Sequence, residues 1–177
     1  MEYITSDLHF FHKNILKFSP KRECFKDINH MNEVLIQEWN LKVSEQDTIY
    51  HLGDFSFAGR EKTRSLLARL HGNKAFILGN HCYKLKGLYE EYGEVYDCLE
   101  IKHKDVKVCL MHYPIAAWNG QGRGSVMLHG HCHGSYQGEG RILDVGWCKH
   151  GRILTLDSAV QWCINRDIVV VDHHKII

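Results

Sequence analysis

Two periodicities alternate along the chain. Short runs rich in aliphatic and β-branched residues stand between turn-forming residues, a pattern typical of strands. They predict seven strands: Tyr3–Thr5, Thr48–Leu52, Ala75–Leu78, Val106–Met111, Val126–Leu128, Ile142–Val145 and Ile168–Val171. Between several of these runs the apolar residues recur every three or four positions, which is the period of an amphipathic helix. Strands that alternate with helices indicate an α/β fold.

Four segments are predicted to be helical. The clearest pattern covers Ile28–Val43, and a shorter one covers Glu61–Leu70. A third helix is predicted to begin after Asp157, which would cap its N-terminus, and to end at Ile164. The segment Phe10–Phe18 is expected to hold a short helix, because a proline follows it at position 20.

The composition narrows the class of protein. The 177 residues are 44% hydrophobic and 24% charged, with two prolines and no linker-like or repetitive stretch. We therefore expect one globular domain over residues 1–177. The formal net charge of +1 provides no overall basic field, so strong non-specific binding to nucleic acid is not expected. The sequence leaves the oligomeric state open.

Three further features of the sequence bear on the cellular location and on possible ligands: the lack of long apolar runs, the scattered cysteines and the excess of histidine. No apolar run approaches the roughly 20 residues of a membrane span, and the first residues do not resemble a signal peptide. Seven scattered cysteines without a C-x-x-C pair argue against disulfides and a thiolate zinc site. We expect a cytoplasmic protein with no membrane partner. Histidine is in excess, with 14 residues, and it suits metal ligation and proton transfer.

Residues that can bind metal ions follow five of the predicted strands. They are Asp7, His9, Asp54, Asn80, His81, His112, His131 and His133. Residues two apart in an extended chain point to the same face, so Asp7 and His9 can reach one ion or two neighbouring ions. The set exceeds the four ligands of a tetrahedral zinc. It suits two ions with mixed nitrogen and oxygen donors.

Taken in order, these motifs resemble those of the calcineurin-like metallophosphoesterases. The matching motifs are Asp7-x-His9, Gly53-Asp54, Gly79-Asn80-His81, His112 and Gly130-His131-x-His133. The segments 6–10, 39–40 and 51–54 are similar to the small, cap-less bacterial and phage members. The resemblance implies a four-layer α/β/β/α sandwich with a dinuclear metal centre at one rim.

The resemblance also implies roles for the individual residues. By matching positions, Asp7, His9 and His133 would hold the first ion, Asn80, His112 and His131 the second, and Asp54 would bridge both. Manganese is the foremost candidate, with iron, nickel and zinc as alternatives. A hydroxide between the ions would attack phosphorus in line. His81 would stabilise the developing charge or protonate the leaving oxygen, a role worth about 10²–10⁴-fold.

The chain departs from this family at two places. Cys82 follows Gly-Asn-His where many relatives have an acid, and Phe55-Ser56-Phe57 follows Gly-Asp where the protein phosphatases have Asp-Arg-Gly. The acid that orients the catalytic histidine of those phosphatases is therefore missing at Phe57. A protein Ser/Thr phosphatase is not expected. The two phenylalanines are instead expected to form an apolar wall that stacks a base or an aromatic ester.

Other polar residues are weaker candidates for the site. His12 and Asn14 lie at the start of the first predicted helix and are candidates for contact with substrate phosphate, with local capping and an exposed polar surface as the alternative. Arg123 stands in a Gly-x-Gly-x-Gly segment as a candidate phosphate clamp, with a flexible loop as the alternative. His51 and His129 are expected to be structural.

The favoured function is hydrolysis of a small phosphodiester or a nucleotide-type phosphate. The absence of a large specificity cap predicts an open metal rim, which suits small diesters. A phosphomonoesterase or a nuclease on the same site is the alternative within this class. A non-catalytic binding scaffold that reuses the fold is the alternative from a different class.

Overall fold

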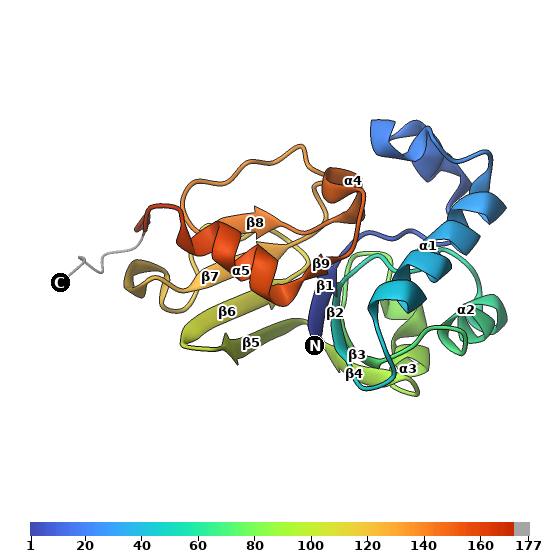
Figure 1. The fold of residues 1–177 in the computed structure, drawn as a ribbon, viewed down its shortest axis with the longest axis horizontal. Helices are drawn as coiled ribbons and strands as arrows, with labels where there is room; N and C mark the ends of the chain where they lie inside the picture. Colours follow the sequence, from blue (N-terminus) through green and yellow to red (C-terminus); the bar gives the residue numbers. More distant parts are fainter. Residues whose placement is uncertain (172–177) are drawn as a thin grey trace.

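The structure of the chain is a computed structural model that describes residues 1–171 (Figure 1). Within these residues, the strands are β1 (Glu2–Thr5), β2 (Thr48–Leu52), β3 (Asn73–Ile77), β4 (Gly93–Tyr96), β5 (Cys98–His103), β6 (Val106–Met111), β7 (Val126–His129), β8 (Ile142–Asp144) and β9 (Leu154–Thr155). The α-helices are α1 (Ile28–Lys42), α2 (Arg60–Leu67), α3 (Lys86–Tyr89), α4 (Trp147–His150) and α5 (Leu156–Ile164). The short 3₁₀ helices are η1 (Lys13–Lys17), η2 (Pro20–Arg22), η3 (Tyr83–Leu85) and η4 (Gln121–Arg123).

The strands form two sheets. The first sheet has the order β4-β3-β2-β1-β9, in which β1 to β4 are parallel and β9 runs antiparallel to β1. The second sheet has the order β5-β6-β7-β8, in which β6, β7 and β8 are parallel and β5 pairs antiparallel with β6. Parallel strands end at the same edge of their sheet, so the loops after β1, β2 and β3 are neighbours, as are those after β6 and β7.

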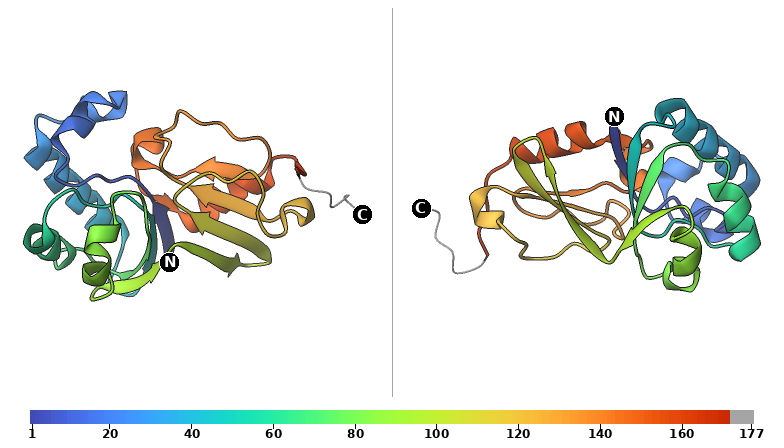
Figure 2. Two further views of the ribbon diagram at one scale, coloured as in Figure 1. Left: turned by 180° about the vertical axis from the view of Figure 1, so that it is seen from behind. Right: turned by 90° about the horizontal axis from the view of Figure 1, so that it is seen from below.

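Figure 2 shows the second sheet lying beside β1, with α1 and α2 on the far side of the first sheet. One hydrophobic cluster joins the first sheet to its helices and includes Leu35, Trp39 and Phe76. A second cluster lies between the sheets and includes Ile4, Leu110 and, from α5, Val160. The alternation of side chains along each strand explains this division, because neighbouring residues face opposite sides of the sheet. The two-sheet α/β fold is thereby confirmed.

The predicted elements agree with the structure except at a few places. The segment 168–171 contains no strand, so that prediction was wrong, and β4, β5 and β9 were not predicted. The predicted cap of the last helix was also wrong. Thr155 caps α5 by accepting a hydrogen bond from Ser158 N at 3.2 Å, and Asp157 lies inside the first turn. Between residues 10 and 18, only η1 is helical, and it is a 3₁₀ helix.

Candidate metal centre

The candidate ligands come from the ends of strands in both sheets. The first sheet supplies Asp7 and His9 after β1, Asp54 after β2, and Asn80 with His81 after β3. The second sheet supplies His112 after β6 and the pair His131 and His133 after β7. Figure 2 shows why these ends can meet, since β1 lies at the boundary between the two sheets.

One group of donors gathers around the Asp7 carboxylate. Asp7 Oδ1 lies 3.7 Å from His9 Nε2 and 3.8 Å from His133 Nε2. The ligand atoms of these three residues lie within 4.8 Å of one another, which is a spacing that a single cation can fill. The other carboxylate oxygen, Asp7 Oδ2, accepts a hydrogen bond from His131 N at 2.9 Å. The carboxylate is therefore anchored on one oxygen and free on the other.

A second group gathers around Asp54. Its Oδ2 lies 3.8 Å from His112 Nε2 and 4.0 Å from His9 Nε2, so one carboxylate oxygen faces a histidine of each group. Asp54 and His112 also form a ligand-sized cluster with Asp7. Asn80 Oδ1 is 3.1 Å from His112 Nε2, and the His131 ring packs edge-on against that of His112 with centroids 5.1 Å apart. The fold thus brings together all seven residues predicted as ligands.

Five of these residues share an uncommon backbone conformation. Asp7, His9, Asp54, His131 and His133 have φ angles of 55°, 52°, 55°, 67° and 50°. Non-glycine residues rarely adopt this left-handed region, because Cβ approaches the carbonyl oxygen. Such strain persists only where the surroundings enforce it, and it concentrates at functional sites. The local chain therefore bends at each donor and turns the side chain out of the strand direction.

Glycines allow the loops to approach the donors closely. A Cβ on Gly130 would lie 2.5 Å from Asp7 Oδ2 and would also collide with the Ser6 hydroxyl. A Cβ on Gly79 would collide with Asp54 Oδ1. The backbone N–H groups of His131 and His81 can reach the two carboxylates because Gly130 and Gly79 carry no side chain.

The buried polar atoms of the site indicate a cation. Within residues 1–171, Asp7 Oδ1 and His9 Nε2 are buried without a hydrogen-bond partner. Burial alone would raise the pKa of Asp7, but the His9 side chain and the charges on His112 and His133 outweigh it and hold that pKa well below its ordinary value. Burial lowers the pKa of His9. An ionised carboxylate facing a neutral imidazole, both unpaired, is the donor set that a divalent cation satisfies.

His81 lies at the open rim of this cluster. Its side chain is 48% exposed, and its Nε2 is 3.9 Å from Asp54 Oδ2. Its backbone N–H donates to Asp54 Oδ1 at 3.1 Å, which fixes the residue beside the candidate bridging carboxylate. No carboxylate of residues 1–171 other than Asp54 pairs with its ring. The ring instead packs on Phe57, with centroids 4.6 Å apart.

The predicted apolar wall consists of Phe57 without Phe55. Phe57 stacks on His12 at 4.0 Å with an interplanar angle of 6°, and on His9 at 4.9 Å. Phe55 is 1% exposed and packs in the core against Trp39. The prediction for Phe55 was wrong: no regular strand covers residues 55–57, and the Phe55 ring packs into the core while the Phe57 ring packs against the histidines of the site.

The three candidate substrate-binding residues occupy different places. His12 joins the site through its Nδ1, which lies 3.3 Å from His9 Nδ1, and burial together with His9 lowers its pKa to about 4. Asn14 lies in η1 and is exposed. Arg123 ends η4, just before β7 begins, whereas the ligands follow the other end of β7. The fold therefore does not bring Arg123 to the cluster.

Several supporting residues were not found from the sequence. Arg22 is fully buried and donates to the carbonyl oxygens of Asp7 and Leu8 at 2.6 and 3.1 Å. Cys148 contacts the ring of His133, and Asp144 accepts from the N–H of Gly134 at 2.8 Å. In the sequence, Arg22 lies between Lys21 and Glu23 in a charged run, which carries no signal of burial.

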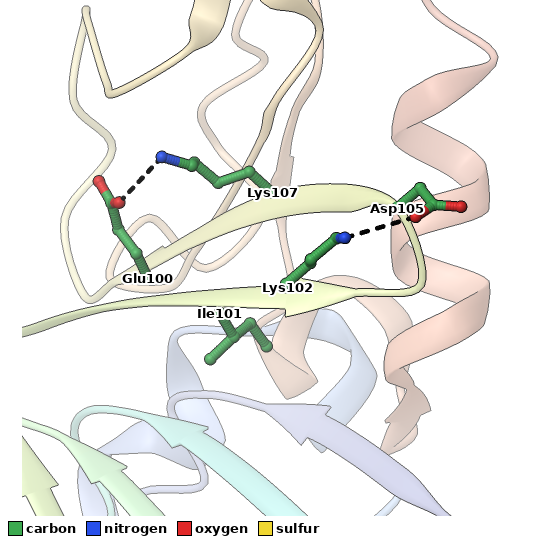
Figure 3. A pocket seen from close by; sticks show the side chains of 5 residues that line it. All are labelled: Glu100, Ile101, Lys102, Asp105 and Lys107. Carbon is green, nitrogen blue, oxygen red and sulfur yellow. Dashed lines mark hydrogen bonds and ion pairs between the residues drawn. The ribbon is translucent and has the colours of Figure 1, made fainter.

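A pocket far from these strand ends has no free charge for a phosphate. Figure 3 shows it on the β5–β6 hairpin, lined by Glu100, Ile101, Lys102, Asp105 and Lys107. Lys102 Nζ is 3.4 Å from Asp105 Oδ1, and Lys107 Nζ is 3.5 Å from Glu100 Oε2. Both cations are paired, so the strand-end cluster remains the candidate site. In the described part of the chain, no helix has the length and apolar character needed to cross a bilayer.

Several known proteins are similar to this chain in sequence or in fold. An uncharacterized protein of Methanocaldococcus jannaschii is 33% identical over 77% of this chain and 72% of its own length. The Gene 66 protein of Mycobacterium phage L5 is 27% identical over 88% of this chain and 90% of its own. The crystal structure of the protein of unknown function AQ665 from Aquifex aeolicus has the same fold, with a TM-score of 0.72 at 24% identity over 92% of this chain and 98% of that chain.

The family model for calcineurin-like phosphoesterases matches residues 3–176, nearly the whole chain. The order of the motifs and the convergence of their side chains agree with that match. The chain belongs to the calcineurin-like phosphoesterase family and is a metallophosphoesterase, a hydrolase of phosphoric esters.

Proposed function

We propose that the protein is a dinuclear-metal phosphodiesterase that acts on small phosphodiesters or nucleotide-type phosphates. The observation that carries the proposal is the position of Asp54 Oδ2, within 4.0 Å of the Nε2 atoms of His9, His81 and His112. A single carboxylate that faces donors of two groups is suited to bridging two ions.

The ligands divide between the two ions as follows. Asp7, His9 and His133 would hold the first, Asn80, His112 and His131 the second, and Asp54 would contact both. When bound, the two ions would supply an acidified water and positive charge for the phosphoryl oxygens. Manganese is our first choice, because carboxylate, amide and imidazole donors suit it, and iron, nickel and zinc accept the same set.

The chain's own residues would act on the rest of the substrate. His81 is exposed at the rim, so its Nε2 can stabilise the charge on the departing oxygen or protonate it. Phe57 packs on His81, His12 and His9 and limits the approach of water to these rings. His12 is neutral near pH 7 because its pKa is lowered, so it would contact the substrate as a hydrogen-bonding group rather than as a charge.

The preference for a diester follows from the openness of the rim and from its charge. His81 and His131 are exposed at the strand ends. A diester carries one negative charge fewer than a monoester dianion, and within residues 1–171 the ion pairs of Asp7 and Asp54 are with histidines rather than with lysine or arginine. A monoesterase or a nuclease would use the same donors. A non-catalytic scaffold would not require His81.

The test combines metal analysis with turnover. The purified chain is reconstituted with manganese, and the bound metal is measured together with the hydrolysis of an aryl phosphate monoester and its bis-aryl diester. We expect two ions per chain and faster diester turnover. Asp54→Asn should lose its activity together with either the second ion or both ions. Asp105→Asn, on the exposed β5–β6 hairpin, is the matched control and should keep both ions and activity. One ion per chain, or a monoester rate far above the diester rate, would overturn the proposal.

A further inference from the structure

A buried arginine lies directly beneath the first group of ligands. Arg22 has no exposed surface, and no carboxylate of residues 1–171 forms an ion pair with it. Its guanidinium donates to Asp7 O at 2.6 Å and Leu8 O at 3.1 Å, and it lies 5.0 Å from the centre of the Trp147 ring. Burying a guanidinium is costly unless its donors find acceptors, so these contacts offset the cost of burying Arg22.

Arg22 also donates to two sulfur atoms, and one of these contacts leads to His133, a candidate metal ligand. Arg22 Nε donates to Cys148 Sγ at 3.1 Å, and the same sulfur lies 3.1 Å from His133 Nδ1. Cys148 is 5% exposed and belongs to α4, which packs against η2, the short helix that ends with Arg22. One sulfur atom therefore links the guanidinium to the imidazole.

The direction of these hydrogen bonds follows from the chemistry of the donors. A guanidinium Nε can only donate, so the sulfur accepts from Arg22. His133 Nε2 faces Asp7 Oδ1 at 3.8 Å and must carry a lone pair if it is to bind a cation there. The ring proton then lies on Nδ1, and the sulfur accepts this second hydrogen bond as well.

We propose that Cys148 and Arg22 are positioning residues of the metal centre, and that Cys148 Sγ fixes the tautomer and ring orientation of His133. Metal-binding histidines usually donate their second N–H to a carboxylate or a backbone carbonyl. Here a cysteine sulfur takes that place, and Arg22 holds the sulfur. The proposal rests on the proposed function to the extent that His133 is taken as a ligand.

Arg22 adds a second effect on the same ligand group. Its hydrogen bonds to Asp7 O and Leu8 O hold the segment in which Asp7 and His9 have left-handed φ angles. One guanidinium thus supports the backbone of two donors and, through Cys148, the side chain of a third. Removal of a hydrogen-bonding partner behind a ligand typically costs about 10–100-fold in metal affinity.

The first experiment measures the affinity for Mn²⁺ in the full chain by competition with a chelator. Cys148→Ala is expected to bind one of the two ions about 10–100-fold more weakly, and Cys148→Ser, which keeps an acceptor, to recover most of that loss. Cys163→Ala is the matched control, because Cys163 is also buried but lies in α5, in the cluster between the sheets. Equal affinity in Cys148→Ala and the unmodified chain overturns the proposal. So does a loss that Cys148→Ser does not recover, because it would indicate packing alone.

The second experiment needs neither a variant nor a bound metal. Long-range ¹H–¹⁵N spectra of the histidine-labelled, chelator-treated chain at a pH above the titration of the ring report its tautomer directly. We expect the proton of His133 on Nδ1, and finding it on Nε2 overturns the proposal. If the chain binds no divalent ion at all, the proposed function fails, whereas the tautomer still decides the role of Cys148.

Discussion

Asp54 Oδ2 lies 3.8 Å from His112 Nε2, although the two residues follow strands of different sheets. The carbonyl oxygen of Leu52 accepts a hydrogen bond from His112 Nδ1 at 2.7 Å, so the proton of a neutral ring is on Nδ1. Its Nε2 then presents a lone pair to both Asp54 and the Asn80 amide oxygen, 3.1 Å away. A cation between these three acceptors would relieve their mutual repulsion, and Leu52 and Asp54, at the end of β2, position the second ligand group for it.

Replacing His81 should separate catalysis from metal binding. His81→Ala is expected to lower kcat by about 10²–10⁴-fold with little change in bound metal, since its ring is exposed at the rim and is not required by either cluster. Steady-state kinetics and metal analysis on the same preparation check this. His71→Ala is the control, because that side chain is 43% exposed and its one ion pair within residues 1–171 is with Glu45, away from the candidate ligands. Undiminished turnover in His81→Ala would favour the non-catalytic scaffold.

Phe57 and Phe55 should behave differently despite their proximity in sequence. Phe57→Ala removes the ring against which His81 and His12 pack, so kcat should fall by about tenfold and KM for an aryl diester should rise, with little loss of stability. Phe55→Ala should instead cost about 3–5 kcal/mol in the free energy of unfolding, because it empties a core position. Urea unfolding and steady-state kinetics on both variants test this contrast. The idea fails if Phe57→Ala has unchanged kinetics.

The buried ring of His51 should make the fold sensitive to acid. It is 1% exposed, neither ring nitrogen has a hydrogen-bond partner within residues 1–171, and burial lowers its pKa to about 3 from 6.5. Between pH 3 and pH 6.5, the unfolded chain therefore binds a proton on His51 that the folded chain does not bind. This contribution to stability is complete above pH 6.5 and is lost as the pH falls towards 3.

His51→Leu removes that proton linkage while it keeps an apolar side chain among Phe55 and Phe76. Urea unfolding of the chelator-treated proteins from pH 7 down should show a shallower loss of stability in the variant. The difference at low pH should be on the order of a few kcal/mol. Parallel pH profiles for the two proteins would show that His51 does not carry this linkage.

Removal of metal should destabilise the folded chain. Asp7 and Asp54 lie together at the cluster, and a cation that binds only the folded state adds about 2.7 kcal/mol at 100 times its Kd. For a chain of this size, that gain corresponds to a rise in Tm of roughly 5–10 °C. Thermal unfolding with manganese and with chelator measures it. Asp54→Asn should show a smaller rise, and an unchanged Tm in the parent chain would contradict the metal assignment.

Much of the fold was predictable because its central strands are rich in strand-forming residues. β2 and β6 match their predicted ranges, because β-branched, aromatic and aliphatic residues dominate both segments. The edge strands β4 and β5 were missed because polar residues such as Glu94 and Lys102 interrupt them. The run at 168–171 has strand-like residues but pairs with neither sheet. Strand pairing depends on the tertiary fold, and the local pattern of hydrophobic residues carries no information about it.

The ligand set was predictable because each donor follows a strand and the carboxyl ends of parallel strands meet. The residues that support the ligands from the protein interior could not be predicted in this way. Arg22 and Cys148 are 126 positions apart in the sequence, and neither belongs to a motif. The left-handed φ angles of Asp7 and His133 were equally hidden, since only glycine signals that conformation by its identity.

The division of the donors between two sheets has a mechanical consequence. Asp7 follows a strand of the first sheet and His133 follows a strand of the second, so a cation held by both would close a long loop of the chain, as a covalent cross-link does. With metal bound, the two sheets would be tied together and would unfold in one cooperative step. Without it, each half of the molecule would open more independently.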